Sequence, residues 1–228
     1  MLRLVKVARD TAVKSRLQAM IALKAALVTA PDEFRAELEG LSDFRLITAC
    51  ATLRDAPPSE PASAARYVLR SLAQLWLALH EGIKAHTRHL TQITEEMAPQ
   101  LTARFGIGFD CAAELLVAAG DNGERIRSEA AFAKLCGVCP IPASSGRTTG
   151  RQRLNRGGNR QANAALNRTV IVRLRWHQPA IDYAARRTAE GLTKKEIIRC
   201  LKRYVAREFF HLLPRSANQE SQDFVHAA

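Results

Sequence analysis

Residues 62–97 read ASAARYVLRSLAQLWLALHEGIKAHTRHLTQITEEM, the most regular pattern in the chain. One seam of mostly apolar side chains recurs at alternating steps of three and four residues: Leu69, Leu72, Trp76, Leu79, Ile83, His86, Leu90, Ile93 and Met97. Because this is heptad spacing, it predicts one long helix that buries a stripe against a partner helix. The partner is either residues 2–29 of this chain or the same helix of another copy. We interpret His86 as a polar seam residue that sets the register rather than as a zinc ligand or catalytic group.

The segments before this helix are also predicted to be helical. Residues 2–29 contain neither glycine nor proline, and they carry apolar side chains at helical spacing: Val13, Leu17, Met20 and Leu27. Residues 33–53 predict one or two short helices broken near Gly40, and the prolines of residues 56–61 predict a linker. We therefore interpret residues 1–98 as long antiparallel coiled-coil helices that serve oligomerisation.

Residues 101–116 predict two helices joined by the turn Gly106-Ile107-Gly108. This turn resembles the helix-hairpin-helix element of DNA-binding proteins, in which backbone N–H groups at the start of the second helix meet a phosphate. The alternative is a pair of packed helices whose glycines only permit close approach. Asp110, just inside the second helix, argues against phosphate binding because it places a negative charge there.

The C-terminal half predicts four more helices: one capped by Ser128, one from about Asn159 to Trp176, one from Pro179 to Gly191, and one that follows the capping box Thr193-Lys-Lys-Glu196. The apolar side of the second contains Ala162, Ala165, Thr169, Val172 and Trp176. The last helix is expected to bury Ile197, Leu201, Val205 and Phe209 and to expose its cations, Lys202 among them. The prediction is an all-α protein, with a compact helical domain at residues 99–212 and a disordered tail at 213–228.

The charge of the chain points to an anionic partner. The net charge is +12, and nine Lys or Arg residues but no acidic residue lie between Glu129 and Asp182. This composition indicates an acidic polymer or an anionic membrane surface. No apolar run approaches the length of a membrane span and no signal-peptide pattern opens the chain, so we expect a cytoplasmic protein that binds nucleic acid. The five cysteines, an odd number, argue against a disulfide framework, and Cys136-Gly-Val-Cys139 lacks a second pair of zinc ligands.

Residues 140–160 concentrate glycine, serine, asparagine and arginine just before a helix. Arginine side chains bind phosphate oxygens through two N–H groups at once, and glycine lets backbone N–H groups approach an anion. The candidate nucleic-acid ligands are Arg147, Arg151, Arg153, Arg156, Gly157, Gly158, Asn159, Arg160, Asn163 and Arg168, together with Gly106 and Gly108 of the hairpin. Ser144 and Ser145 are hydroxyls inside this arginine cluster and could attack phosphorus, although Ser-Ser-Gly is also an ordinary turn sequence.

The stretches GVCPIPASSG (137–146) and RLNRGGNRQAN (153–163) resemble the C-terminal transposase domain of the IS110 family of bacterial insertion sequences, also called IS116 or IS902. The Gly-Ile-Gly hairpin and residues 186–204 are similar to the family as well. The resemblance implies a DNA recombinase in which a serine forms a covalent phosphoserine link to DNA. It places this nucleophile at Ser145, with Ser144 as the second choice. It also implies a guide RNA as partner, and a homo-oligomer held by the coiled coil.

Full-length members of the family begin with a RuvC-like α/β domain, whose DEDD carboxylates bind Mg²⁺. The acidic pairs of this chain lie on helical segments without a strand pattern, so we expect the chain to begin just after that domain and to hold no cofactor itself. We therefore expect it to bind nucleic acid but to be weak or inactive in strand exchange alone. The alternative is a non-catalytic module for nucleic-acid binding and oligomerisation.

Overall fold

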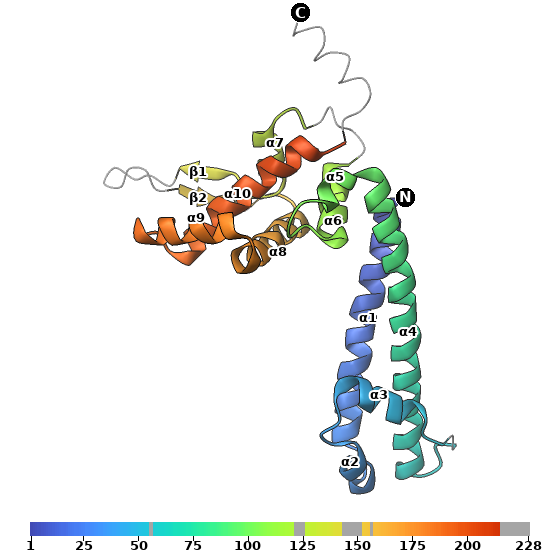
Figure 1. Cartoon of the computed structure of the whole chain (residues 1–228). Helices are drawn as coiled ribbons and strands as arrows, with labels where there is room; N and C mark the ends of the chain where they lie inside the picture. The colour runs from blue at the N-terminus through green and yellow to red at the C-terminus, as the bar shows by residue number, and fades with distance from the viewer. Residues whose placement is uncertain (55–56, 121–125, 143–151, 156, 215–228) are drawn as a thin grey trace, which may run out of the picture. The chain divides into compact units, whose positions relative to one another are not determined.

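The computed structural model describes residues 1–54, 57–120, 126–142, 152–155 and 157–214 (Figure 1). The chain divides at residues 89 and 90, within one long helix, into two compact units. This division falls before the predicted boundary at residue 98, although the helix itself ends at Met97. Each unit is built around its own group of buried side chains.

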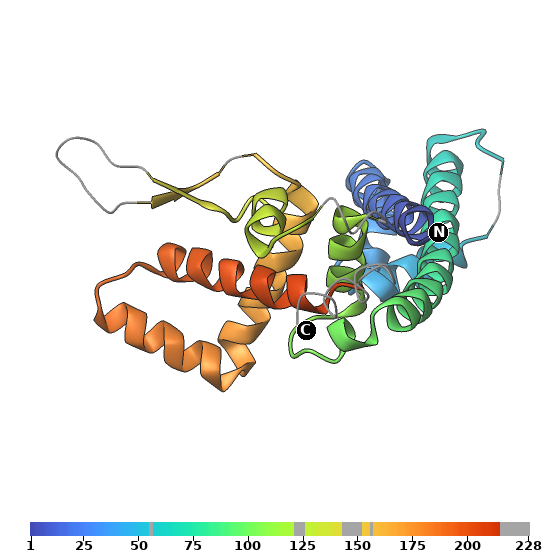
Figure 2. The same ribbon diagram turned by 90° about the horizontal axis from the view of Figure 1, so that it is seen from above.

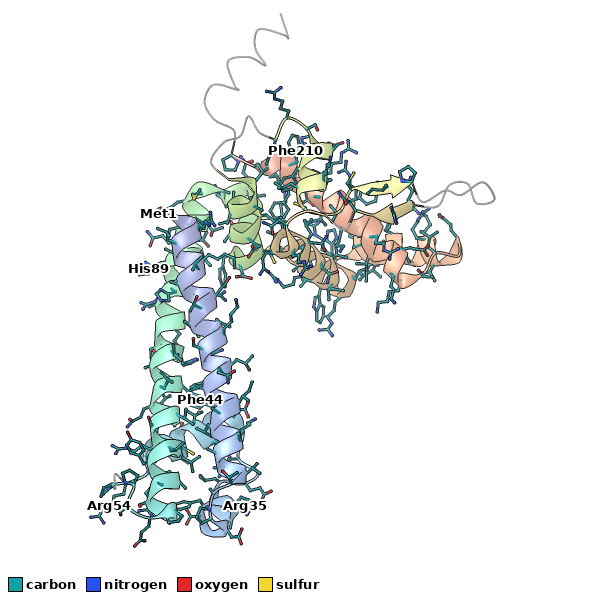
Figure 3. The ribbon with its side chains drawn as sticks, turned by 180° about the vertical axis from the view of Figure 1, so that it is seen from behind. Met1, Arg35, Phe44, Arg54, His89 and Phe210 are labelled. Atoms are coloured by element: carbon teal, nitrogen blue, oxygen red, sulfur yellow. The ribbon has the colours of Figure 1, made fainter. Side chains whose placement is uncertain are left out.

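The first unit pairs two long helices, α1 (Leu2–Val28) and α4 (Pro61–Met97), which run side by side in opposite directions (Figure 1). Figure 3 shows Met1 and His89 at one end of this unit, and Arg35 and Arg54 at the other. Two short helices, α2 (Asp32–Leu38) and α3 (Asp43–Ala51), connect α1 to α4. The partner of the predicted seam is therefore α1 of the same chain.

Contacts between α1 and α4 show the pairing in detail. Arg9 Nε donates to Thr87 Oγ1 at 3.1 Å, and an Arg16 guanidinium nitrogen lies 2.8 Å from His80 Nδ1. Leu69, Ala73 and Trp76 of α4 are buried with Leu23 of α1 and Ile47 of α3, among others. The predicted seam is wrong for its last residue, since the Met97 side chain is 41% exposed and not buried. The coiled-coil register itself stays a prediction.

The second unit contains six helices and two short strands among its described residues. They are α5 (Pro99–Thr102), α6 (Phe109–Ala119), α7 (Glu129–Leu135), β1 (Pro140–Pro142), β2 (Gln152–Leu154), α8 (Arg160–Trp176), α9 (Gln178–Ala189) and α10 (Lys194–Leu212). Helix α8 is central, because it packs against α6, α9 and α10, while α10 also covers α7. Figure 2 shows β1 and β2 side by side where they extend from the helices. Phe132, Leu166, Val170 and Phe209 are fully buried.

Three predicted helix starts are confirmed by their caps. Ser128 Oγ accepts from the Ala131 N–H at 3.1 Å, and Asn159 Oδ1 accepts from the N–H groups of Gln161 and Ala162. Both halves of the Thr193–Glu196 capping box are present. These bonds satisfy N–H groups that the first turn of a helix leaves without a partner.

The all-α prediction is confirmed, with one addition. Residues 140–142 pair with residues 152–154 in an antiparallel ladder, in which Ile141 lies opposite Arg153. Both strands have only three residues and β1 contains two prolines, so no alternating pattern could indicate them.

Two expected faces need correction. Val172 and Trp176 of α8 are 41% and 70% exposed, whereas Leu166 and Val170 are fully buried, because α8 is covered by helices on more than one side. Lys202 of α10 is only 8% exposed, although it was expected at the surface. The predicted faces of α10 are otherwise confirmed by the burial of Ile197, Leu201, Val205 and Phe209.

Candidate nucleic-acid interface

The predicted nucleophiles and three of the predicted arginines lie outside the described residues. These are Ser144, Ser145, Arg147, Arg151 and Arg156. The structure describes the segments on both sides of them, together with the other predicted ligands: Arg153, Gly157, Gly158, Asn159, Arg160, Asn163, Arg168, Gly106 and Gly108. We refer to β1 and β2 as the ribbon.

The ribbon brings together the two chain segments that flank the serines. The pair Pro142 and Gln152 is the last of its ladder. Below the ladder, the Asn155 N–H donates to the Cys139 carbonyl at 3.1 Å and continues the pairing. Arg153 is exposed on β2. The described part of the chain therefore holds both approaches to the serine-bearing segment side by side.

The base of the ribbon, where its two arms meet the helices, is a contact between two glycines. Gly137 follows α7 and Gly158 precedes α8, and their φ angles are +65° and +103°. A Cβ atom on Gly158 would lie 2.6 Å from the Gly137 nitrogen and 2.8 Å from the Leu135 carbonyl oxygen. The Asn159 N–H donates to the same Leu135 oxygen at 2.7 Å. Gly158 therefore allows two backbone segments to approach each other closely. This role requires no bound phosphate.

Asn163 of α8 fixes the same base by its side-chain amide. Its Nδ2 donates to the carbonyl oxygens of Cys136 and Gly137, each at 3.0 Å, and its Oδ1 accepts from Lys202 Nζ at 2.9 Å. We refer to Gly137, Gly158, Asn159 and Asn163 as the ribbon root. Asn163 was predicted to contact nucleic acid, and the structure shows its amide engaged within the protein.

Sequence reasoning missed Lys202. Its ammonium is buried, and desolvation lowers the pKa of Lys202 below its ordinary value, an effect to which the charge of Arg199 adds. A helical wheel of α10 does place Lys202 beside Phe209 and Ala206, so its position on the apolar side was available as a signal. The general rule that lysine stays at the surface outweighed that signal.

The Gly-Ile-Gly hairpin is packed directly on α8. Gly106 has φ +77°, and a Cβ there would lie 3.3 Å from Arg173 Cγ and 3.4 Å from the Thr169 carbonyl oxygen. Close packing is therefore one role of Gly106. This agrees with the alternative interpretation of the turn, in which the glycines permit two helices to pack closely. Gly108 precedes α6 with open space where its Cβ would be. Because α5 spans only Pro99–Thr102, the assignment as a helix-hairpin-helix remains a prediction.

Arg168 connects this hairpin to α8. One of its guanidinium nitrogens donates to Asp110 Oδ2 at 3.0 Å, and the Arg168 side chain remains 49% exposed. Asp110 therefore compensates a cation that was predicted to bind nucleic acid. Any phosphate that binds Arg168 competes with this carboxylate.

Other cations lie exposed on α8 and α10. They include Arg160, Arg175, Lys194, Lys195 and Arg199. By contrast, Arg173 is tied to Glu208 through two nitrogens, at 2.7 and 3.2 Å, and Arg207 Nε lies 2.9 Å from Glu129 Oε2. The exposed cations are more available to phosphate oxygens than Arg173 and Arg207, because their side chains face solvent.

The described residues contain no group of three His, Cys, Asp or Glu side chains that could hold a metal ion. In the Cys136–Cys139 pair, Cys136 is buried and desolvation raises its pKa to about 12. No helix within the described ranges is long and apolar enough to cross a membrane.

Comparison with known proteins places this site in a class. The family model described as Transposase IS116/IS110/IS902 family matches residues 98–185, which include the ribbon and its root. The chain is also similar to the insertion element IS110 uncharacterized 43.6 kDa protein of Streptomyces coelicolor. The identity is 30% over 157 residues, which are 68% of this chain and 38% of that protein. The site therefore lies within the region that matches the transposase family model. The chain is a member of the IS116/IS110/IS902 family and spans well under half the length of this relative.

Proposed function

We propose that this chain acts in DNA transposition as part of an insertion-sequence transposase. The observation that carries the proposal is the family match over residues 98–185, which encloses the serine-bearing segment and the basic helix α8. The ribbon supports it, because the ladder and its root bring the flanks of that segment together. The proposed substrate is DNA, bound through phosphate contacts of the exposed arginines and lysines.

In the proposed reaction, Ser145 is the nucleophile and Ser144 the second choice. The serine Oγ forms a bond to a DNA phosphorus while the bond from that phosphorus to a deoxyribose oxygen breaks. The proton of the hydroxyl passes through solvent to the oxygen that leaves. Arginine side chains that neighbour the serines in the sequence would stabilise the charge that develops on the phosphoryl oxygens. The Mg²⁺ of the family belongs, by resemblance, to carboxylates of a RuvC-like domain. The described residues offer no such cluster, and no step of this proposal uses a metal.

We further propose a guide RNA as second nucleic-acid partner, which rests on the family alone, and a homo-oligomer. The oligomer is supported by apolar side chains that α1 leaves exposed. Val7, Ile21 and Val28 are 56%, 53% and 69% exposed and lie multiples of seven residues apart, with Leu17 beside them at 62%. Heptad spacing of exposed apolar residues favours a further helix as partner.

The proposal is tested by searching for a covalent protein–DNA adduct. The purified chain is incubated with a labelled duplex made of the genomic DNA that flanks its gene, with RNA transcribed from that flank, and then resolved on a denaturing gel. Because the chain alone is expected to be weak in strand exchange, we expect at most a faint adduct, which is lost in Ser145→Ala and retained in Ser144→Ala. An adduct lost only in Ser144→Ala moves the nucleophile. DNA binding without an adduct in any variant supports a non-catalytic binding module instead.

A further inference from the structure

If stability were the only requirement, lysine would be an unfavourable residue at the position of Lys202. Its side chain is 8% exposed, and the one hydrogen-bond acceptor recorded for it among the described residues is the neutral Oδ1 of Asn163. Burial of an ammonium without a carboxylate partner is costly, and a well-packed apolar side chain of similar size is often as stable or more so. The like charge of Arg199 adds to the cost. The position of Lys202 therefore calls for a role other than packing.

The hydrogen bonds of the Asn163 side-chain amide indicate what that role is. Because Oδ1 faces Lys202 Nζ, Nδ2 must face the other way, toward the carbonyls of Cys136 and Gly137. These carbonyls stand where the chain leaves α7 for β1. On the other arm of the ribbon, the Asn159 N–H and the Gly158 backbone meet the Leu135 carbonyl. Lys202 thus selects the amide orientation that joins the two arms to α8 and α10.

A small rotation at the root has a large effect at the far end of the ribbon. Pro142 lies five positions after Gly137, at most about 16 Å of chain, so a tilt of about 10° moves the end by at most about 3 Å. Ser144 and Ser145 lie two and three positions after Pro142 in the sequence. In catalysis a misplacement of about 1 Å can reduce a rate roughly a hundredfold.

We propose that Lys202 is a positioning residue, whose buried ammonium orients Asn163 and thereby fixes the direction of the ribbon that leads to the serine-bearing segment. The inference rests on the proposed function for its catalytic consequence, and on the root contacts alone for its structural consequence. Lys202 acts through Asn163 and does not itself contact DNA.

The structural consequence is measured by amide hydrogen exchange on the full chain. Lys202→Met keeps the length of the side chain and removes the charge. We expect the Asn155 and Asn159 amides to exchange about tenfold faster in this variant, since the root opens locally, while amides within α10 stay unchanged. Lys195→Met, on the exposed side of the same helix, is the matched control and is expected to leave all of these rates unchanged. Lys202→Gln keeps an uncharged donor, and we expect it to restore part of the protection.

The path through Asn163 is tested by a double-mutant cycle. Asn163→Ala alone is expected to speed exchange at the root at least as much as Lys202→Met, and the double variant is expected to add nothing further. Additive effects would contradict the coupling. Root amides that exchange in Lys202→Met as slowly as in the parent chain would overturn the proposal. If Lys202→Met unfolds the chain, the same comparison is made with Lys202→Gln.

The catalytic consequence is measured in the adduct assay. We expect Lys202→Met to slow adduct formation at least tenfold, with DNA affinity changed less than twofold, because the serine and not the DNA is misplaced. An unchanged rate of adduct formation would contradict the claim that Lys202 affects catalysis. If Ser145→Ala and Ser144→Ala both leave the adduct intact, the proposed nucleophile fails, while the exchange measurement still decides whether Lys202 positions the ribbon.

Discussion

Gly137 and Gly158 meet backbone to backbone, so that a Cβ on Gly158 would lie 2.6 Å from the Gly137 nitrogen. Gly158→Ala must therefore both adopt a strained φ and push two chain segments apart. We expect a loss of about 2–4 kcal/mol in the free energy of unfolding of the second unit, the sum of strain and overpacking. Urea titration followed by circular dichroism measures it.

The matched control for this prediction is Gly191→Ala. Gly191 also has a positive φ, +89°, but nothing lies within 4 Å of the site of its Cβ. Only the strain should remain, at about 1–2 kcal/mol. Equal losses in the two variants would show that the contact between Gly137 and Gly158 contributes nothing.

Arg173 links α8 to α10 and to the hairpin. It donates to both carboxylate oxygens of Glu208 and, through Nε, to the Phe105 carbonyl at 2.9 Å, with its side chain 13% exposed. Arg173→Met leaves that carbonyl without its donor and leaves Glu208 with only the longer contact to Arg104 Nε, at 3.8 Å. We expect a loss of about 1.5–3 kcal/mol in unfolding free energy, measured by urea titration. Lys84→Met, which removes the solvent-exposed pair with Glu81, should leave the free energy of unfolding almost unchanged.

Asp110 forms an ion pair with Arg168. Substitutions of these two residues should therefore change DNA affinity in opposite directions. Asp110→Asn removes the negative charge that pairs with the Arg168 guanidinium, so DNA affinity should rise several-fold. Arg168→Ala should lower affinity and reduce the slope of log affinity against log salt by about 0.9, the value for one phosphate contact. Fluorescence anisotropy with a short labelled duplex over a series of KCl concentrations measures both. If Arg168→Ala binds as tightly as the parent chain at every salt concentration, Arg168 is no DNA ligand.

The buried cysteines should resist thiol reagents in the folded chain. Burial raises the pKa of Cys50 to about 11 and that of Cys136 to about 12, so both thiols stay protonated at pH 8 and are also covered. Because the thiolate is the reactive form, we expect Cys139, which is partly exposed, to react with a disulfide reagent well before Cys136. Cys136 should stay unreactive at both pH 8 and pH 9 until the chain unfolds.

Mass spectrometry of labelled peptides identifies the thiols that have reacted. Cys139→Ser provides the control, because it should remove the fastest labelled site and leave Cys136 unlabelled. Formation of a bond between Cys136 and Cys139 under mild oxidation, without unfolding, would contradict the interpretation of this pair as structural.

The exposed face of α1 predicts the oligomeric state. Leu17 and Ile21 are 62% and 53% exposed, one helical turn apart. Replacing both with Asp should reduce the molar mass measured by light scattering, because a charge in an apolar helix interface is left unpaired. The matched control replaces Thr11 and Ser15, exposed polar residues on another side of the same helix, with Asp. An unchanged mass in the Leu17/Ile21 variant would rule out this face as the interface.

Helix positions were predictable because their signals are local. A cap such as Ser128 or Asn159 acts within three residues of its own position, and the capping box at Thr193 is read from four consecutive residues. The buried face of α10 was predictable for the same reason, since one side of that helix carries nearly all of its apolar residues. The face of α8 was not, because its burial depends on several neighbouring helices that meet it from different sides.

The sequence by itself determined the helical class, the helix ends and the basic, serine-bearing segment, since periodicity, caps and charge are properties of neighbouring residues. It also supported the resemblance that the family match later bore out. Only the tertiary structure decided that α1 is the partner of α4 and that Asp110 pairs with Arg168. It also showed that Asn163 and Lys202 meet at the ribbon root. These contacts join residues 39 to 78 positions apart, and whether a polar side chain faces DNA or its own backbone depends on packing that no local pattern encodes.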